Sequence, residues 1–424
     1  MTPFAQVRVV IALLLLLATS LLAACGEQEE IAEPTEQPPA AASPGTDDAS
    51  PTRSGIPTPA STPVSTIMPS APIVVALDPN GGEHYKLYLI DTTGAPPQRL
   101  TPENSEIVGA ESAPVWSPDG HRLVFVGYVG DGVDLFTINA DGTGLRNVTN
   151  IAKHTTQPSW SPDGAQIAYV RSDADSRDIH VINADGSDNH ALTGGLEHES
   201  DPIWSPDGEW IAFLRTVFVP TESNDPDRAA TEAAGEDDSA ADSQAAEGEF
   251  QTMICLMRPD GNDERVLATV HFAEGLQWSP DGQQLAFSTY DGFRENQHAQ
   301  IVNVDGSNPH TLDNGTVESS LPNWSPDGSW ISAVVTDQGG SAASIVVMNV
   351  DGTDARSVAD LPGWHAWSPD GSQILVKQGR VTIDGNPTGR SNLNIVSATA
   401  AEPAQILLLE DVSIGSNPAW RPMS

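Results

Sequence analysis

Histidine and acidic side chains are concentrated in the short segments that come directly before a repeated tryptophan. Imidazole and carboxylate groups that converge from several segments are what a ligand site, or a divalent metal site for calcium or a transition metal, requires. The candidate residues for this site are Glu111, His154, His198, Glu199, Asp201, His271, Glu274, Glu318 and His365. The other interpretation, which we favour, is that these side chains line a wet channel and simply face water.

The sequence contains no complete catalytic motif. The nearest match to the nucleophile elbow G-x-S-x-G is the GGSAA segment at 339–343, which lacks the last glycine and falls between two expected strands. A P-loop, an H-E-x-x-H helix, an EF-hand loop and a dinucleotide fingerprint are all missing from the sequence. We therefore predict no catalytic residue and no cofactor, with the divalent metal as the one exception left open.

A repeat fixes the positions of the candidate segments. Its tryptophans are separated by 44, 44, 74, 46, 43 and 53 residues, and apart from the longer intervals this period suits a four-stranded propeller blade. W-S-P-D-G is complete at each tryptophan except the last, which continues as Arg421-Pro422. The repeated tryptophans are Trp116, Trp160, Trp204, Trp278, Trp324, Trp367 and Trp420.

Each repeat predicts four short antiparallel strands. The first enters the tryptophan, and Ser-Pro-Asp-Gly turns the chain into a second strand that is apolar on both faces, such as 123–125. A third strand ends at an Asp-Gly turn, for example Asp141-Gly142, before a brief fourth strand. We expect the indoles to fill the space between sheets, because burying one is worth about 4–6 kcal/mol before entropy is counted.

Strand direction then separates two faces of the domain. The Ser-Pro-Asp-Gly and Asp-Gly turns fall on one face as short hairpins. The segments before the tryptophans fall on the other face, at the mouth of a central channel. The candidate site is therefore expected at this channel mouth.

The W-S-P-D-G run resembles the TolB-type propeller repeat, a WD-like Pro-Asp repeat, over residues 72–422. The resemblance implies an all-β fold: a seven-bladed β-propeller of four-stranded antiparallel blades, with six or eight blades as alternatives. It identifies a scaffold, because similar proteins include envelope-assembly factors, the non-catalytic propellers of peptidases and some polysaccharide lyases. In such lyases a metal is held largely by histidines, but no motif here matches their ligands residue by residue.

The ends of the repeat predict how the ring closes. The first unit begins with the second-type strand 73–77, and the chain ends with a first-type strand at Trp420. Pairing of the N- and C-terminal strands completes one blade and leaves no open sheet edge.

The N-terminal region indicates export and a lipid anchor. Residues 1–24 combine Arg8 with an apolar core and end in Leu-Ala-Ala before Cys25, which resembles a bacterial lipoprotein signal peptide with Cys25 as the acylated, palmitate-carrying residue. Residues 25–70 are rich in Pro, Ala, Ser and Thr and predict a disordered linker.

The propeller domain then occupies 71–424, with an acidic disordered insertion at about 216–249. The second cysteine, Cys255, is expected to be buried and inert.

The net charge of −39 restricts the partners of the protein. Nucleic acid and anionic surfaces are poor partners, because both require Lys/Arg patches. We expect a monomer that meets an envelope protein or a glycan and reaches the membrane through its lipid. It is expected on the outer face of the cell membrane, or on the outer membrane facing the periplasm.

Three functional hypotheses follow from the sequence. The leading one is a non-catalytic protein- or ligand-binding module at the cell envelope. The second is a metal-dependent polysaccharide lyase or other glycan-processing enzyme with its site at the channel mouth. The third is a passive structural component of the envelope.

Overall fold

The computed structural model describes the residues that form the repeats. They are 72–78, 85–93, 95–103, 107, 114–130, 132–151, 153–220, 248–291, 295–312, 318–336, 343–360, 363–379, 382–383, 386–387, 390–399 and 405–423. The signal peptide, Cys25, the linker to residue 70, Glu111 and residues 221–247 of the insertion lie outside these ranges. Within them the structure is built from β-strands, and no helix there is long and apolar enough to cross a membrane.

The strands form successive antiparallel sets of four, and each set is named below by its first strand. The β1 sheet has β1 (Ile73–Asp78), β2 (Lys86–Ile90) and β3 (Gln98–Arg99), with β30 (Ala419–Trp420) on β1. The β4 sheet has β4 (Val115–Trp116), β5 (Arg122–Val129), β6 (Gly132–Asn139) and β7 (Arg146–Asn147). The β8 sheet has β8 (His154–Trp160), β9 (Gln166–Ser172), β10 (Arg177–Asn183) and β11 (His190–Ala191). The β12 sheet has β12 (His198–Trp204), β13 (Ile211–Pro220), β14 (Gly248–Met257) and β15 (Arg265–Val270).

The second half of the domain repeats this order. The β16 sheet has β16 (Phe272–Trp278), β17 (Gln284–Asp291), β18 (Glu295–Asn303) and β19 (His310–Thr311). The β20 sheet has β20 (Glu318–Trp324), β21 (Trp330–Thr336), β22 (Ala343–Asn349) and β23 (Arg356–Ala359). The β24 sheet has β24 (Gly363–Trp367), β25 (Gln373–Gln378), β28 (Ser391–Ser397) and β29 (Gln405–Ile414). A small hairpin, β26 (Thr382–Ile383) with β27 (Asn386–Pro387), lies between β25 and β28 in the sequence.

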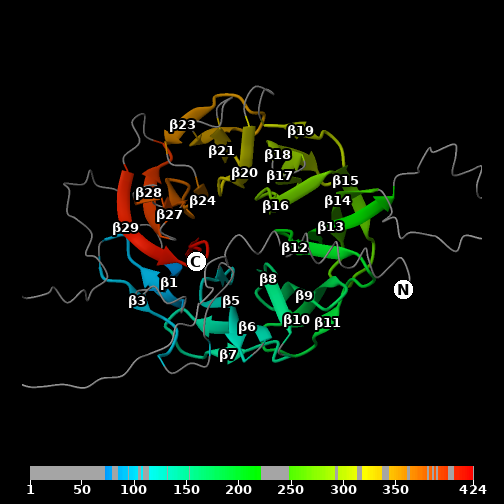
Figure 1. Cartoon of the computed structure of the whole chain (residues 1–424), viewed down its shortest axis with the longest axis horizontal. Coiled ribbons are helices and arrows are strands. Elements are labelled where there is room, and N and C mark those ends of the chain that lie inside the picture. Colours follow the sequence, from blue (N-terminus) through cyan, green and yellow to red (C-terminus); the bar gives the residue numbers. More distant parts are fainter. Residues whose placement is uncertain are drawn as a thin grey trace, which may run out of the picture. The chain divides into compact units, whose positions relative to one another are not determined.

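The sheets follow one another around a centre in the order of the chain, as Figure 1 shows. The first strand of each set is the innermost, except in the β1 sheet, where β30 takes that place. Each inner strand contacts the next, from β4 through β8, β12, β16, β20 and β24 to β30. The predicted all-β, propeller-like architecture of four-stranded antiparallel sheets is therefore confirmed.

The Ser-Pro-Asp-Gly runs form tightly bonded hairpin turns. In the β8 sheet the Ser161 hydroxyl donates to Asp163 Oδ1 at 2.6 Å and accepts the backbone N–H of Gln166 at 2.9 Å. The hydrogen bond from Ser161 lowers the pKa of Asp163, since it favours the ionised carboxylate. The same bonds recur at the other complete copies, which explains why Ser and Asp are repeated together.

The Asp-Gly turns need glycine for two reasons. Gly186 has a φ of 82°, a left-handed conformation that only glycine adopts without strain. A Cβ at this position would also lie 2.9 Å from the carbonyl oxygen of Val148 in the preceding sheet. The turn therefore sets the spacing of neighbouring sheets as well as the direction of the chain.

The repeated indoles join neighbouring sheets. Trp160 Nε1 donates to the carbonyl of Val115 at 3.1 Å, and Val115 directly precedes the tryptophan of the previous sheet. Trp116, Trp278, Trp367 and Trp420 make the equivalent bond, at 3.1–3.3 Å. Trp204 and Trp324 are exceptions, because their indole nitrogens have no acceptor among the described residues. The tryptophans fill the space between sheets, as predicted. Where the indole hydrogen bond is present, it also fixes the orientation of the ring against the previous sheet.

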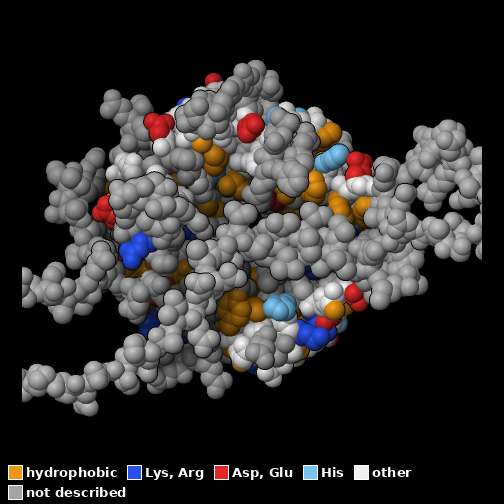
Figure 2. Space-filling model, viewed as in Figure 1, with side chains coloured by type: hydrophobic (Ala, Val, Ile, Leu, Met, Phe, Trp, Pro, Cys, Tyr) orange, Lys and Arg blue, Asp and Glu red, His pale blue; other side chains and the backbone are white. Residues whose placement is uncertain are grey.

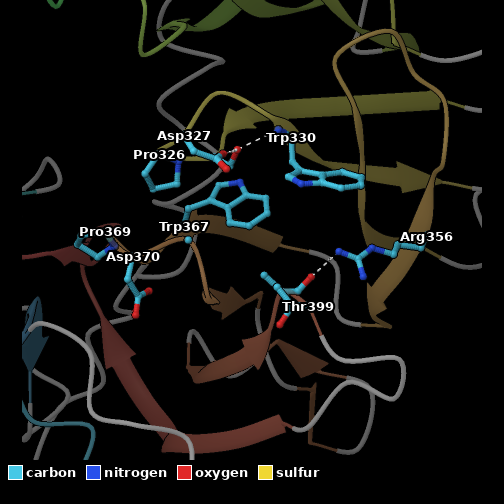
Figure 3. Close-up of a pocket in the computed structure, with 11 residues that line it drawn as sticks. Pro326, Asp327, Trp330, Arg356, Trp367, Pro369, Asp370 and Thr399 are labelled. Carbon is cyan, nitrogen blue, oxygen red and sulfur yellow. Dashed lines mark hydrogen bonds between the residues drawn. The ribbon is translucent and has the colours of Figure 1, made fainter.

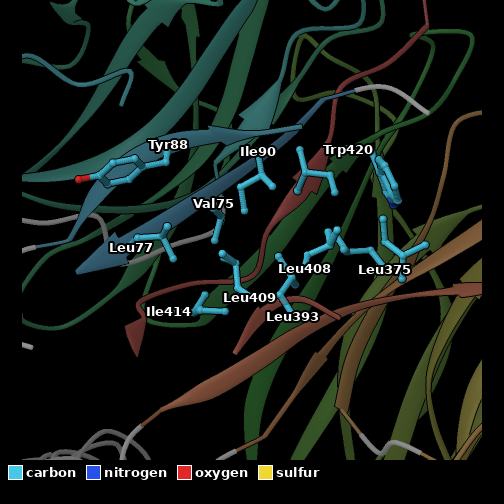
Figure 4. Close-up of a cluster of buried hydrophobic side chains, with 12 residues drawn as sticks. Val75, Leu77, Tyr88, Ile90, Leu375, Leu393, Leu408, Leu409, Ile414 and Trp420 are labelled. Atoms are coloured by element: carbon cyan, nitrogen blue, oxygen red, sulfur yellow. The ribbon is translucent and has the colours of Figure 1, made fainter. Parts of the chain in front are cut away.

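The N-terminal and C-terminal strands pair with each other. Ile73 lies opposite Trp420 and Val74 opposite Ala419 in an antiparallel register, while the other end of β1 pairs with β29. Figure 4 shows the apolar cluster at this junction, in which Val75 and Trp420 pack with side chains of β25, β28 and β29.

The arms of the hairpin that carries the acidic insertion are longer than the sequence suggested. β13 continues to Pro220 and β14 begins at Gly248, so both ends of the range 216–249 are strand. Phe218 and Phe250 face each other across these arms, with ring centroids 5.3 Å apart. Cys255, on β14, is fully buried, and burial raises the pKa of its thiol to about 12, in line with an inert residue.

Candidate functional site at the inner strands

The candidate residues lie on inner strands that share a β-bulge. The pairing of β8, β12, β16 and β20 with their neighbours shifts register three residues before the tryptophan. Gln157, Asp201, Gly275 and Leu321 occupy this position, with φ between 52° and 70°. Positive φ is uncommon for a residue other than glycine, and bulges of this kind redirect side chains next to binding sites.

Three candidates stand exposed at the outer ends of the inner strands. His154 begins β8, His271 directly precedes β16, and Glu318 begins β20. They form a polar rim on the face opposite the Ser-Pro-Asp-Gly turns. Glu111 lies outside the described residues, so its predicted place at this rim stays a prediction.

Glu199 belongs to a buried ion pair. It is 1 % exposed, and its Oε1 accepts from Arg215 Nε at 2.7 Å while Oε2 accepts from Thr193 at 3.3 Å. Arg215 also bonds Glu264 on the loop before β15. Burial is the largest influence on Glu199 and raises the pKa of its carboxyl, although Arg215 opposes the effect. Both carboxylate oxygens of Glu199 are therefore engaged by residues of the protein, and Glu199 holds sheet elements together.

Asp201 is the candidate whose ionisation is most disturbed. Burial, and then the negative charge of Glu274 on the next inner strand, raise the pKa of Asp201 to about 6. Gln157 of the preceding inner strand donates to Asp201 Oδ1, and the backbone N–H of Asp201 donates to Gln157 Oε1 at 3.2 Å. Three consecutive inner strands thus meet at this carboxyl group.

His365 is a second disturbed group, farther along the row of inner strands. It is fully buried, and desolvation lowers the pKa of its imidazole to about 4, so it is neutral at physiological pH. Its Nε2 lies 3.4 Å from Asn323 Nδ2, and Asn323 Oδ1 in turn accepts from Gln277 at 2.8 Å. His365 occupies the position that proline holds in most other repeats, two residues before the tryptophan.

The structure brings together only part of the predicted set. The charge of Glu274 raises the pKa of Asp201 across adjacent inner strands, whereas His154, His271 and Glu318 lie at or next to the ends of three different inner strands. Within the described ranges, no group of three His, Cys, Asp or Glu side chains is placed to hold a metal ion.

Sequence reasoning missed the amide side chains that connect the inner strands. Gln157, Gln277 and Asn323 each bond a partner on a neighbouring inner strand, although the partners are 42–46 residues apart in the chain. The signal was available, since these amides precede the tryptophan by one or three residues in successive repeats.

The opposite face has a hollow of about 340 Å³ between the β20 and β24 sheets. Figure 3 shows Trp330 and Trp367 inside it, with Asp327, Asp370 and Arg356 at its border. Most of its polar groups are already engaged: Ser325 donates to Asp327 at 2.7 Å, and Arg356 donates to the carbonyl of Ala398 at 2.7 Å. We therefore assign this hollow to the packing of turns rather than to the candidate site.

Comparison with known proteins agrees with this architecture. Residues 72–217 match the sequence model of the TolB beta propeller domain. The chain carries a TolB-like β-propeller. A curated relative of this propeller, the uncharacterized peptidase YuxL of Bacillus subtilis (strain 168), is 35% identical over 109 residues, which cover 24% of this chain. The match spans only 16% of the length of YuxL.

Solved structures share the fold of this TolB-like propeller at low sequence identity. The oligogalacturonate lyase of Vibrio parahaemolyticus has a TM-score of 0.55 and 13% identity, covering 80% of this chain and 85% of the lyase. A puromycin-hydrolyzing peptidase of Mycobacterium tuberculosis has a TM-score of 0.55 and 15% identity, covering 81% of this chain and 54% of the peptidase. At such low sequence identity these similarities show that the fold is shared and nothing more, because one fold can carry unrelated activities.

Proposed function

We propose that this TolB-like propeller is a non-catalytic binding module that takes a protein or ligand at its channel-mouth face. The observation that carries the proposal is the meeting of Gln157, Asp201 and Glu274 on three consecutive inner strands. A carboxyl group held with a raised pKa beside a second carboxylate costs stability at neutral pH. Residues kept at such a cost are typical of binding sites.

The proposed location is the cell envelope, with the chain exported and anchored through a lipid on Cys25. The support is the sequence of residues 1–25, which lie outside the described structure. Cys25→Ser should release the protein from the membrane fraction into the soluble fraction. A Ser variant that stays in the membrane fraction would contradict the anchor.

The domain itself is proposed to be a seven-bladed ring, in which β30 completes the blade begun by β1. The register of Ile73 with Trp420 and the chain of contacts between inner strands support this count and this closure. A closed ring holds the inner strands rigidly, which suits a preformed binding face.

Affinity capture from the native envelope tests the binding role. Asp201→Asn combined with Glu274→Gln should lose the partner that the wild-type protein retains. Asp141→Asn combined with Asp185→Asn removes the same number of charges from the opposite face and should retain it. Equal capture by both double variants would overturn the proposal.

The second candidate function is a metal-dependent lyase or other glycan-processing enzyme. The fold similarity to the Vibrio lyase and the rim histidines favour it. It requires a divalent ion bound to the purified protein and lost on His154→Ala or His198→Ala. Elemental analysis that finds no such ion would exclude this candidate and leave the binding module.

A further inference from the structure

Arg177, at the start of β10, differs from the other well-placed arginines. The chain has 19 Lys and Arg against 58 Asp and Glu, so a basic group is seldom far from an acid. Arg215 and Arg258 form ion pairs, and Arg122 donates to a backbone carbonyl. Within the described residues Arg177 makes no hydrogen bond, ion pair or ring contact, although it is partly buried and burial lowers its pKa.

His198 stands directly beside Arg177. The two residues are paired across β10 and β12, which run parallel at this point, so their side chains leave the same side of the sheet. His198 Nδ1 is buried and has no hydrogen-bond partner within the described ranges. An unpaired guanidinium and an unpaired imidazole nitrogen therefore lie next to each other at the channel-mouth face. Figure 2 shows Lys or Arg and His side chains gathered over the β8–β10 region.

The acids around this pair bond groups other than Arg177. Glu199 accepts from Arg215 at 2.7 Å, and Asp173 accepts from Lys153 at 2.8 Å. Asp178 Oδ2 accepts from the Ser176 hydroxyl at 2.8 Å, while its buried Oδ1 has no hydrogen-bond partner among the described residues. Within the described part of the chain, none of these carboxylates forms an ion pair with Arg177. An unpaired, partly desolvated charge is costly, and an external anion would remove that cost.

We propose that Arg177 and His198 form a binding site for the carboxylate or phosphate group of a small ligand that carries one anionic group. The proposal rests on the binding function of the channel-mouth face and names the ligand chemistry for one part of it. The guanidinium supplies two parallel donors to the anion, and His198 supplies a third. The net charge of −39 repels polyanions, which restricts the site to ligands with one anionic group.

The pH dependence follows from the groups that face His198. Arg177 and Asp178, both on β10, act on the imidazole with opposite signs, and burial is the largest influence and lowers its pKa. A bound anion favours the charged imidazole. Acetate, which is fully ionised at both pH values, should therefore bind more tightly at pH 6 than at pH 8, and His198→Asn should abolish the difference.

Titration with sodium acetate and, separately, sodium phosphate at constant ionic strength tests the site. The probe is the Cε1–H resonance of His198 in protein labelled with ¹³C-histidine. This resonance should shift and saturate, while that of exposed His154 does not. Saturation by acetate alone identifies a carboxylate site, and saturation by phosphate alone a phosphate site. If the resonances of His198 and His154 shifted equally and without saturation, the shifts would be non-specific ion effects only, and the proposal would be overturned.

Arginine variants give the second arm of the experiment. Arg177→Gln should weaken binding of the anion at least tenfold. It should not lower the thermal midpoint, because no partner is lost and an unpaired, partly buried charge is removed. Arg177→Lys, which keeps the charge without the planar fork, should bind with intermediate strength. Arg146→Gln is the matched control, since Arg146 is exposed near the Asp141-Gly142 turn of the opposite face. Loss of folding in Arg177→Gln, or unchanged affinity, would contradict the proposal. Failure here leaves the capture result with the Asp201 and Glu274 variants unaffected.

Discussion

At the scale of single residues, the inner strands hold ionisable groups in unfavourable protonation states. Asp201 has its pKa raised to about 6 and His365 has its pKa lowered to about 4, in both cases mainly by burial. Each group makes the native state less stable in one range of pH. Variants that remove one group at a time separate the two pH ranges and show whether each group raises or lowers the free energy of unfolding there.

Asp201→Asn should stabilise the protein at neutral pH. The unfolded carboxyl ionises near pH 3.8 and the folded one near 6, so its contribution to stability is full below pH 3.8 and is lost as the pH rises to about 6. The variant should gain about 1–3 kcal/mol in free energy of unfolding at pH 8 and nothing at pH 3.5. Urea unfolding at several pH values measures this. Asp185→Asn is the control, and it should lose stability at neutral pH because a hydrogen bond from Ser187 lowers the pKa of Asp185.

His365→Leu should flatten the acid limb of stability. The buried imidazole must take up a proton as the pH falls from about 6.5 to 4, and the folded state resists this more than the unfolded state. The wild-type protein should therefore lose about 3 kcal/mol over that range, relative to the leucine variant. Leucine already occupies the equivalent position at Leu276. Parallel acid limbs for the two proteins would contradict the assignment.

The sequence identified the type of these residues but not their partners. Asp201 and Glu274 were candidates because of their position before a tryptophan, and both lie on adjacent inner strands. Glu199 was grouped with them, yet alternation along β12 directs it to Arg215. Arg177 was not a candidate, because its importance lies in having no partner, which no local pattern shows.

At the scale of elements, the turns were predictable and the bulges were not. Ser-Pro-Asp-Gly contains its own hydrogen-bonding groups, so the sequence alone specifies the hairpin. The inner-strand bulge places Gln157 and Asp201 at positive φ directly before a proline, where neither residue type signals such a conformation. Contacts with the neighbouring sheet impose that backbone, and they depend on the assembled domain.

Ser161→Ala tests the turn. The change removes an acceptor for the N–H of Gln166 and a donor to Asp163, at a position that is 2 % exposed. Leaving that N–H without a partner should cost about 1–3 kcal/mol in free energy of unfolding, measured by denaturant titration. Ser187→Ala, in the exposed Asp185-Gly186 turn, should cost less than about 0.5 kcal/mol. Equal losses in the two variants would contradict this account of the repeat.

At the scale of the whole molecule, the pairing of β30 with β1 joins the two ends of the described chain. Arg421 extends the junction, since its Nε donates to the carbonyl of Gly120 at 2.8 Å and its guanidinium lies 5.5 Å from the centre of the Trp116 ring. The repeat phase predicted this pairing from Trp420 and residues 73–77. It did not predict the Arg421 contacts, which replace the Ser-Pro-Asp-Gly turn missing from the last copy.

Truncation after Gly415 should destabilise the entire domain. It removes Trp420 from the core and exposes the edge of β1, which then becomes free to pair with other chains. We expect aggregation, measured by light scattering, or a large drop in the thermal midpoint, measured by circular dichroism. Truncation after Pro422 removes the exposed Met423 and the terminal serine and should leave the midpoint unchanged. A soluble, cooperatively folding protein that ends at Gly415 would disprove closure.

The central claim, that the channel-mouth face is the binding face, is tested most directly by site-specific photo-crosslinking in the native envelope. A photoreactive side chain is placed in turn at the exposed rim positions His154, His271 and Glu318, and at the exposed turn positions Asp141, Asp185 and Asp305. We predict a discrete crosslinked adduct from the rim positions and none from the turn positions. Adducts from the turn positions alone would contradict the claim.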